Sequence, residues 1–137
     1  MYRTHIYITL STDLPMIMNR KWAYLITIEG HDKTASATVN TEATRHAATL
    51  EALADALARF KQPAQITVHA QDAWVLNTMQ KTLPKWAESD FRTSRGGEVQ
   101  NRDLWEKVWK KTRYKKMLIN TERHPYSEML LERMKNG

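Results

Sequence analysis

Three segments with strand character follow one another at the start of the chain, and this order constrains the fold more than any other feature. They cover residues 4–10, 22–30 and 33–40. In the first segment Ile6, Ile8 and Leu10 fall on one face, so this strand has one buried and one more polar side. Turn-forming residues, among them Gly30, join the segments. The pattern predicts an antiparallel meander that needs helices to cover its apolar face.

Strands and helices alternate in the rest of the chain. Apolar periodicity predicts helices over 42–60, 72–83, 99–112 and 124–135, with strands over 64–70 and 115–121. The resulting order is β-β-β-α-β-α-α-β-α. It predicts a single α/β domain, mixed α+β in detail, over residues 1–137. Its core would be a five-stranded mixed sheet with helices on both faces.

Capping and helix-breaking residues set the expected helix ends. Thr41 is placed to cap the helix over 42–60, and Pro63 ends this helix. Pro84 ends the next helix, because proline cannot continue the hydrogen-bond ladder. Pro125 falls in the first turn of the last helix, where proline is tolerated.

The composition excludes several classes of protein. No run of 18 apolar residues is present, so we expect no membrane span and no membrane partner. The first residues alternate in polarity and lack the apolar block of a signal peptide. There is no cysteine, which leaves no disulfide and no thiolate metal site. We therefore expect a cytoplasmic domain; its oligomeric state is not indicated.

The positive charge is concentrated in the second part of the chain. The net charge is +6. Residues 1–79 carry seven basic and seven acidic side chains, whereas residues 80–137 carry fourteen basic and eight acidic ones. Such a basic region favours a polyanionic partner such as nucleic acid, because phosphate contacts release counterions. The alternative is a solvated face that promotes solubility.

The segment 84–98 is predicted to be a basic protruding loop. It interleaves cations with aromatic rings, and such a surface can contact phosphates and stack on bases. A second basic run lies in the helix over 99–112, in which we expect Trp105 to face the core. The candidate nucleic-acid-binding residues are Lys85, Trp86, Phe91, Arg92, Arg95, Lys107, Lys110 and Lys111. The alternative is that Trp86 and Phe91 anchor the loop to the domain while the cations stay solvated.

Several motifs, in the correct order and spacing, resemble ribonuclease HI, the type I ribonuclease H family. The segment VQNRDLW at 99–105 carries the most specific match. ITVHAQDAWV at 66–75 is similar to the family's fourth strand and the helix entry after it, and LEALADAL at 50–57 to its long first helix. His124–Pro125 resembles the His–Pro pair before the last helix. The resemblance covers nearly the whole chain and implies a ribonuclease H-like fold.

The resemblance also implies a cleavage site built from four acidic residues that hold two divalent metal ions. At the corresponding positions this chain has Ser11, Thr49, Gln71 and Leu131. None of them is acidic, and Mg²⁺ requires oxygen ligands, chiefly carboxylates. The family's flexible histidine falls near Thr121. We therefore expect a degenerate active site with no catalytic residues, no metal ligands and no cofactor.

Acidic residues close to the four positions offer an alternative. They are Asp13, Glu51, Asp72 and either Glu128 or Glu132. A shift of one residue along a strand turns a side chain to the opposite face. A shift of two along a helix turns it by about 200°. Glu51 should therefore point away, and Asp72 is expected to cap a helix. The family's phosphate-contacting residues are not recognisable, and Arg45 and Asn40 are the nearest polar candidates.

Three functional hypotheses follow. The first is a catalytically inactive ribonuclease H-like domain, a pseudoenzyme, that binds nucleic acid through the basic loop and the helix over 99–112. An RNA–DNA hybrid or another duplex would be held through backbone and 2′-hydroxyl contacts. The second is a protein-interaction or structural domain with Trp86 and Phe91 as partner anchors. The third is an active ribonuclease H with a rearranged Mg or Mn site, which at least three converging carboxylates would support.

Overall fold

A five-stranded mixed sheet forms the centre of the molecule. The computed structural model describes residues 2–62 and 64–136. The strands are β1 (Tyr2–Leu10), β2 (Met18–Ile28), β3 (Thr34–Ala43), β4 (Ala64–His69) and β5 (Lys116–Asn120). Their order in the sheet is β3-β2-β1-β4-β5. The first three strands pair antiparallel, and β4 pairs parallel with both β1 and β5. The predicted mixed sheet is confirmed.

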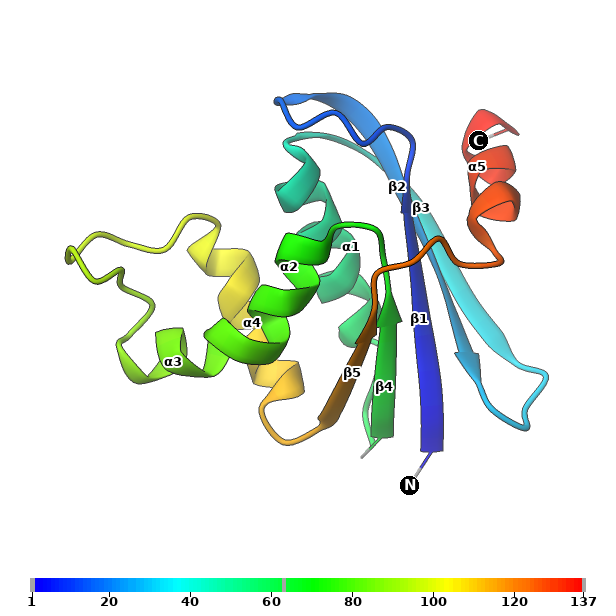
Figure 1. Cartoon of the computed structure of the whole chain (residues 1–137). Coiled ribbons are helices and arrows are strands. Elements are labelled where there is room, and N and C mark those ends of the chain that lie inside the picture. The colour runs from blue at the N-terminus through cyan, green and yellow to red at the C-terminus, as the bar shows by residue number, and fades with distance from the viewer. Residues whose placement is uncertain (1, 63, 137) are drawn as a thin grey trace.

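Helices cover both faces of this sheet. They are α1 (Arg45–Leu57), α2 (Ala73–Asn77), the π-helical turn η1 (Thr78–Thr82), α3 (Leu83–Glu88), α4 (Arg102–Thr112) and α5 (Ser127–Asn136). Figure 1 shows α1, α2 and α4 on one side of the sheet and α5 on the other. No helix in these described ranges is long and apolar enough to cross a membrane.

The side-chain alternation of β1 decides which face of the sheet is the core. Ile6 and Ile8 are almost fully buried and pack against α1, as their spacing predicts. Trp105 of α4 is also fully buried in this main cluster. A second, smaller apolar cluster on the opposite face holds α5, and it includes Leu25 and Leu130. The main core thus fixes the positions of β1, β4 and α1.

The predicted cap of α1 is wrong by three residues. β3 continues to Ala43 because its residues stay paired with β2, and Thr41 therefore belongs to the strand. Thr44 caps the helix instead, and its side-chain oxygen accepts a hydrogen bond from the backbone N–H of Ala47 at 3.1 Å. The expected role of Pro63 lies outside the described residues.

The prediction that Pro84 ends a helix is also wrong. The chain stays helical from α2 through η1 into α3, and Pro84 occupies the first turn of α3. Proline is tolerated there because the amide of that position has no partner within its own helix. The expected loop over 84–98 therefore begins as a helix. Pro125 precedes α5 rather than lying in its first turn.

Candidate functional site

The four positions that the sequence singles out meet in one cavity. Ser11 follows β1, Thr49 lies on α1, Gln71 follows β4, and Leu131 lies on α5. All four line a cavity of about 190 Å³ at the ends of β1 and β4. Segments far apart in the sequence are thus brought together as expected, and the side chains that meet are two hydroxyls, an amide and a hydrocarbon.

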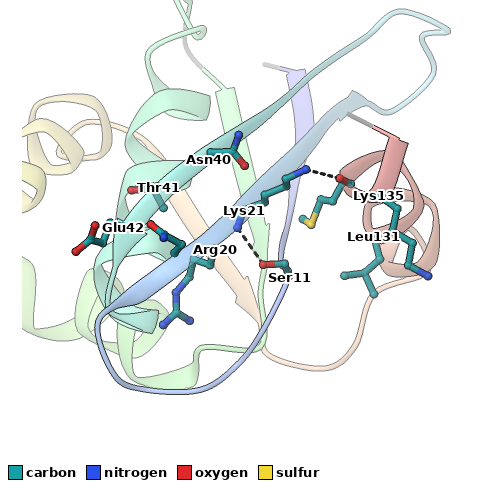
Figure 2. Close-up of a pocket in the computed structure, with 10 residues that line it drawn as sticks. Ser11, Arg20, Lys21, Asn40, Thr41, Glu42, Leu131 and Lys135 are labelled. Carbon is teal, nitrogen blue, oxygen red and sulfur yellow. Dashed lines mark hydrogen bonds between the residues drawn. The ribbon is translucent and has the colours of Figure 1, made fainter.

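The hydroxyl groups in the cavity are tied to the backbone. The Ser11 Oγ accepts a hydrogen bond from the Lys21 backbone N–H at 2.9 Å, which leaves the hydroxyl hydrogen of Ser11 to donate elsewhere. The Thr49 Oγ1 donates to the Arg45 carbonyl oxygen at 3.0 Å. Figure 2 shows the Ser11–Lys21 bond and Leu131 on the facing helix.

Asp72 is the one acidic side chain buried in this cavity wall. Its Oδ1 accepts from the Val75 backbone N–H at 3.2 Å, so it caps α2 as predicted. Its Oδ2 lies 2.6 Å from His46 Nδ1 and 3.9 Å from Arg45 Nε. Both carboxylate oxygens are therefore already engaged with protein groups.

The other nearby carboxylates point elsewhere or lie at the surface. Glu51 faces β2 and β3, where it accepts hydrogen bonds from Trp22 Nε1 and Thr41 Oγ1. Glu128 and Glu132 are exposed on α5 and pair with Arg123 and Lys135. Asp13 lines the cavity from an exposed loop position.

The donor set of the cavity does not fit two divalent metal ions. Within residues 2–62 and 64–136, no group of three or more His, Cys, Asp or Glu side chains could hold a metal. The cavity lining holds two carboxylates, those of Asp13 and Asp72, and the latter is occupied by its cap and by His46. Leu131 places hydrocarbon where a ligand would be required.

Two arginines also line this cavity. Arg45 is the first residue of α1, and Arg123 lies in the connection before α5. The Arg45 Nε is buried and has no hydrogen-bond partner in the described part of the chain. Arg123 lies 3.5 Å from the exposed Glu128. The sequence indicated Arg45 only weakly, because its place in the cavity depends on the cap at Thr44.

A larger cavity of about 750 Å³ adjoins the first and shares Ser11 and Leu131 with it. It lies between β2, β3 and α5, as Figure 2 shows. The Lys21 Nζ donates one of its three hydrogens to the Met134 carbonyl at 2.6 Å, which ties β2 to α5 at this cavity. Thr49 and Gln71 are not among its lining residues, so it is a neighbour of the candidate site.

Arg20 holds the connection between β1 and β2. Its buried guanidinium donates to four backbone carbonyl oxygens, those of Ala43, Thr12, Leu14 and Met16, at 2.6–3.1 Å. A single side chain of β2 therefore fixes both the end of β3 and the loop beside the candidate site.

The aromatic residues of the protrusion pack onto the domain. Figure 1 shows α3 and the loop after it projecting away from the sheet. Phe91 is only 7% exposed and belongs to the core cluster. The half-buried Trp86 meets Trp105 edge to face at a centroid distance of 5.5 Å. These positions correspond to anchoring of the loop, so the expected stacking of Phe91 on a base is not supported by its burial.

Arg102 ties the loop to α4. Its guanidinium contacts Glu106 at 2.7 Å, Asp90 at 3.3 Å and Glu98 at 3.4 Å. The hydrogen bond to Glu106, together with the charges of all three carboxylates, raises the pKa of Arg102. The turn at Gly96 is made with a positive φ of 88°, a conformation that glycine adopts without steric cost.

Most of the predicted cations remain on the surface. Lys85, Arg92, Arg95, Lys107 and Lys110 are exposed, and within the described ranges none of them forms an ion pair. Lys111 differs because it is half-buried, and its Nζ donates to the Phe60 carbonyl at 3.2 Å. The exposed cations of α3 and the loop lie on the protrusion, and those of α4 lie on the helix that follows it and packs against α1.

A histidine cluster that the sequence pattern did not indicate lies on the α5 side of the sheet. His5 Nδ1 and His69 Nε2 are 2.9 Å apart, so at least one of the two rings is neutral. Burial, with smaller effects of His5 and His124, lowers the pKa of His69 to about 4. His124 Nδ1 accepts from the Tyr126 backbone N–H, and Nε2 therefore carries the hydrogen that bonds the Ile8 carbonyl. This cluster anchors the segment leading into α5.

Comparisons with known proteins identify the family to which this fold belongs. The RNase H family model matches residues 9–121. Ribonuclease H of Clostridium botulinum is 35% identical over 60 residues, which are 43% of this chain and 40% of that protein. Ribonuclease H of Zymomonas mobilis is 28% identical over 92 residues, 67% of this chain and 58% of that protein. The matched segments span less than two thirds of the length of these relatives.

Solved structures give the same fold at low sequence identity. The PFV RNase H domain has a TM-score of 0.71 at 14% identity, with 97% of this chain and 92% of that chain covered. The foamy viral protease–reverse transcriptase in complex with an RNA/DNA hybrid has a TM-score of 0.58 at 16% identity, covering 88% of this chain and 17% of that one. The strand order, the meeting of the four positions and the family match agree, and the chain belongs to the RNase H family.

Proposed function

We propose that this RNase H-family domain binds a nucleic-acid duplex, foremost an RNA–DNA hybrid, and does not cut it. The observation that carries the proposal is the cavity at the ends of β1 and β4, which collects Ser11, Thr49, Gln71 and Leu131. Two-metal cleavage requires ligands that neutralise two divalent ions about 4 Å apart. Neutral side chains in these four places cannot supply that charge.

The exposed cations support the binding part of the proposal. Lys85, Arg92, Arg95, Lys107 and Lys110 lie on α3, the following loop and α4, without acidic partners in the described chain. Exposed cations without acidic partners can contact phosphates without reading the base sequence. A protein that shares this fold has been solved with an RNA/DNA hybrid, which makes a hybrid the first ligand to test.

The test combines binding and cleavage of one labelled hybrid. A fluorescent RNA–DNA hybrid is titrated with the full chain at several salt concentrations, and the RNA strand is then analysed on a denaturing gel after incubation with Mg²⁺ or Mn²⁺. We expect saturable, salt-sensitive binding and intact RNA. Cleavage that persists in highly purified protein would contradict the inactive site, and the absence of binding at low salt would contradict the proposed ligand.

A protein partner is the second candidate function. Leu14, Met16 and Ile17 are each more than half exposed on the connection between β1 and β2. A cluster of exposed apolar side chains is typical of an interaction surface. Trp86 and Phe91, the partner anchors that the sequence suggested, pack against the domain instead. If the hybrid is not bound, this connection becomes the surface to test.

A further inference from the structure

The cavity at the ends of β1 and β4 has two arginine side chains in its wall, and one donor atom of Arg45 lacks a hydrogen-bond acceptor in the described chain. The Arg45 Nε is buried without a hydrogen-bond acceptor in the described chain. Its contact with Asp72, at 3.9 Å, is within ion-pair range but too long for a hydrogen bond. A buried donor without an acceptor is unfavourable, so an incoming anionic oxygen would relieve that cost.

We propose that this cavity is a phosphate-binding pocket that works without a divalent metal, with Arg45 as its main cation and Arg123 at its rim. The inference rests on the proposed nucleic-acid binding and specifies its contact: a backbone phosphate group enters the pocket. A guanidinium suits this ligand because its planar fork matches two oxygens of a phosphate.

Neutral donors in the same wall complement the arginines. The hydroxyl hydrogen of Ser11 is left to donate, since the Ser11 oxygen already accepts from Lys21. Gln71 is exposed at the cavity and has two amide hydrogens. Arg45 begins a helix of 13 residues, whose N-terminus adds partial positive charge. Together these groups form donors around a space large enough for a phosphoryl group.

The two acidic side chains in the wall, Asp72 and Asp13, have different surroundings. Both oxygens of Asp72 are engaged, with the Val75 N–H and with His46. Asp13 lies on the exposed loop at the edge of the cavity. Arg45 and Arg123 are therefore the positively charged groups that an anion would meet in this cavity.

The first arm of the test uses inorganic phosphate and the full chain in EDTA. NMR follows the Arg45 Nε–H and the backbone amides of residues 45–49 during a phosphate titration. We expect saturable shifts in the wild type and in Arg3→Gln, a variant that removes one exposed charge at the far end of β1. We expect no saturable shift in Arg45→Gln. Saturable shifts in Arg45→Gln, or no saturable shift in the wild type, would contradict the proposed phosphate-binding pocket.

The second arm uses the labelled hybrid in EDTA and in Mg²⁺ at matched ionic strength. We expect the wild type to bind the hybrid with equal affinity in EDTA and in Mg²⁺. The affinity of Arg45→Gln should be about tenfold lower, because one charge-assisted phosphate contact disappears. Arg123→Gln, whose side chain is exposed and carries little risk to folding, should lose about threefold. Arg3→Gln should change little. An affinity that rises with Mg²⁺ would overturn the metal-independent mode.

The two arms separate the pocket from the proposed function. Hybrid binding that is unaffected in both Arg45→Gln and Arg123→Gln would overturn the pocket and leave nucleic-acid binding intact. Failure of the wild type to bind the hybrid would contradict the proposed function. The phosphate titration would then decide whether the pocket takes a free phosphate instead. Thermal unfolding of each variant confirms that the fold is retained.

Discussion

Phe91 and Arg95 lie four residues apart in the protrusion and have opposite environments. The ring of Phe91 is buried in the core, with the Arg102 guanidinium 5.9 Å from its centroid, whereas Arg95 is exposed. The sequence placed both in one cation–aromatic set, because composition alone does not tell which aromatic ring turns inward. Substitution of Phe91 should therefore affect mainly the stability of the fold, and substitution of Arg95 mainly the binding of nucleic acid.

Phe91→Ala should lower the free energy of unfolding by about 3 kcal/mol, since it opens a cavity where the loop is anchored. Arg95→Gln should change stability by less than about 0.5 kcal/mol and weaken hybrid binding. Urea unfolding and hybrid titration of the two variants provide the measurement. If Phe91→Ala leaves the stability unchanged and weakens hybrid binding, Phe91 contacts the nucleic acid and does not anchor the loop.

His69 should make the protein less stable in acid. Its pKa is about 4 in the folded state, below the 6.5 of a free imidazole, so the unfolded chain binds more protons between these pH values. Stability should therefore fall as the pH drops from about 7 towards 4. The full shift corresponds to about 3 kcal/mol. Solvent screening at this half-buried site reduces the expected loss to on the order of 1–2 kcal/mol.

Urea unfolding midpoints of the wild type and His69→Gln across this pH range test the effect. The variant should show a shallower decline because it lacks the titrating ring. Parallel curves for the two proteins would show that another group governs the acid sensitivity.

At the scale of elements, the order of strands and helices could be predicted, but several boundaries could not. Alternating apolar residues in β1 and the apolar stripe of α1 depend on local periodicity, which the sequence displays directly. The end of β3 depends on pairing with β2, and the helix across Pro84 depends on the π-helical turn η1. The first is decided by pairing between distant residues, which overrides the local capping signal, and the second by the place of Pro84 in the first turn of a new helix.

The salt dependence of binding can show how many phosphate contacts α4 makes. Lys107 and Lys110 are exposed on it, while Lys111 is bound to the Phe60 carbonyl. Lys107→Gln with Lys110→Gln should lower the slope of log affinity against log salt by up to about 2, or one unit for each lost phosphate contact. The charge-matched control is Arg3→Gln with Lys33→Gln, at the other end of the sheet. Equal slopes in the two variants would exclude α4 from the interface.

At the scale of the whole molecule, the sheet topology brings Ser11, Thr49, Gln71 and Leu131 together, although none of them is acidic. The sequence predicted this meeting through the resemblance to ribonuclease HI, and the cavity confirms it. The environment of Arg45 could not be predicted, because it depends on how α1 and α2 approach one another. Topology and site chemistry are therefore separate properties that can be tested separately.

Restoring the carboxylates should restore metal binding. Ser11→Asp, Thr49→Glu, Gln71→Asp and Leu131→Asp together should give a calorimetric signal with Mn²⁺, because oxygen ligands then converge in one cavity. Without metal, this variant should be less stable than the wild type, since like charges repel at short range. Gln62→Glu with Gln80→Glu and Gln100→Glu adds scattered charges as a control. If the variant with four carboxylates gives no calorimetric signal with Mn²⁺, the four side chains are not arranged so that they can coordinate a metal ion.

The guanidinium of Arg20 has a consequence for how the molecule opens. Because it joins the end of β3 to the loop between β1 and β2 through four carbonyls, we expect the opening of one segment to destabilise the other. In hydrogen–deuterium exchange, amides of residues 12–17 and 41–43 should therefore exchange as one cooperative unit, and Arg20→Met should uncouple them. Independent exchange in the wild type would contradict this coupling. If the coupling holds, the loop that exposes Leu14, Met16 and Ile17 keeps its conformation only while the end of β3 stays paired with β2.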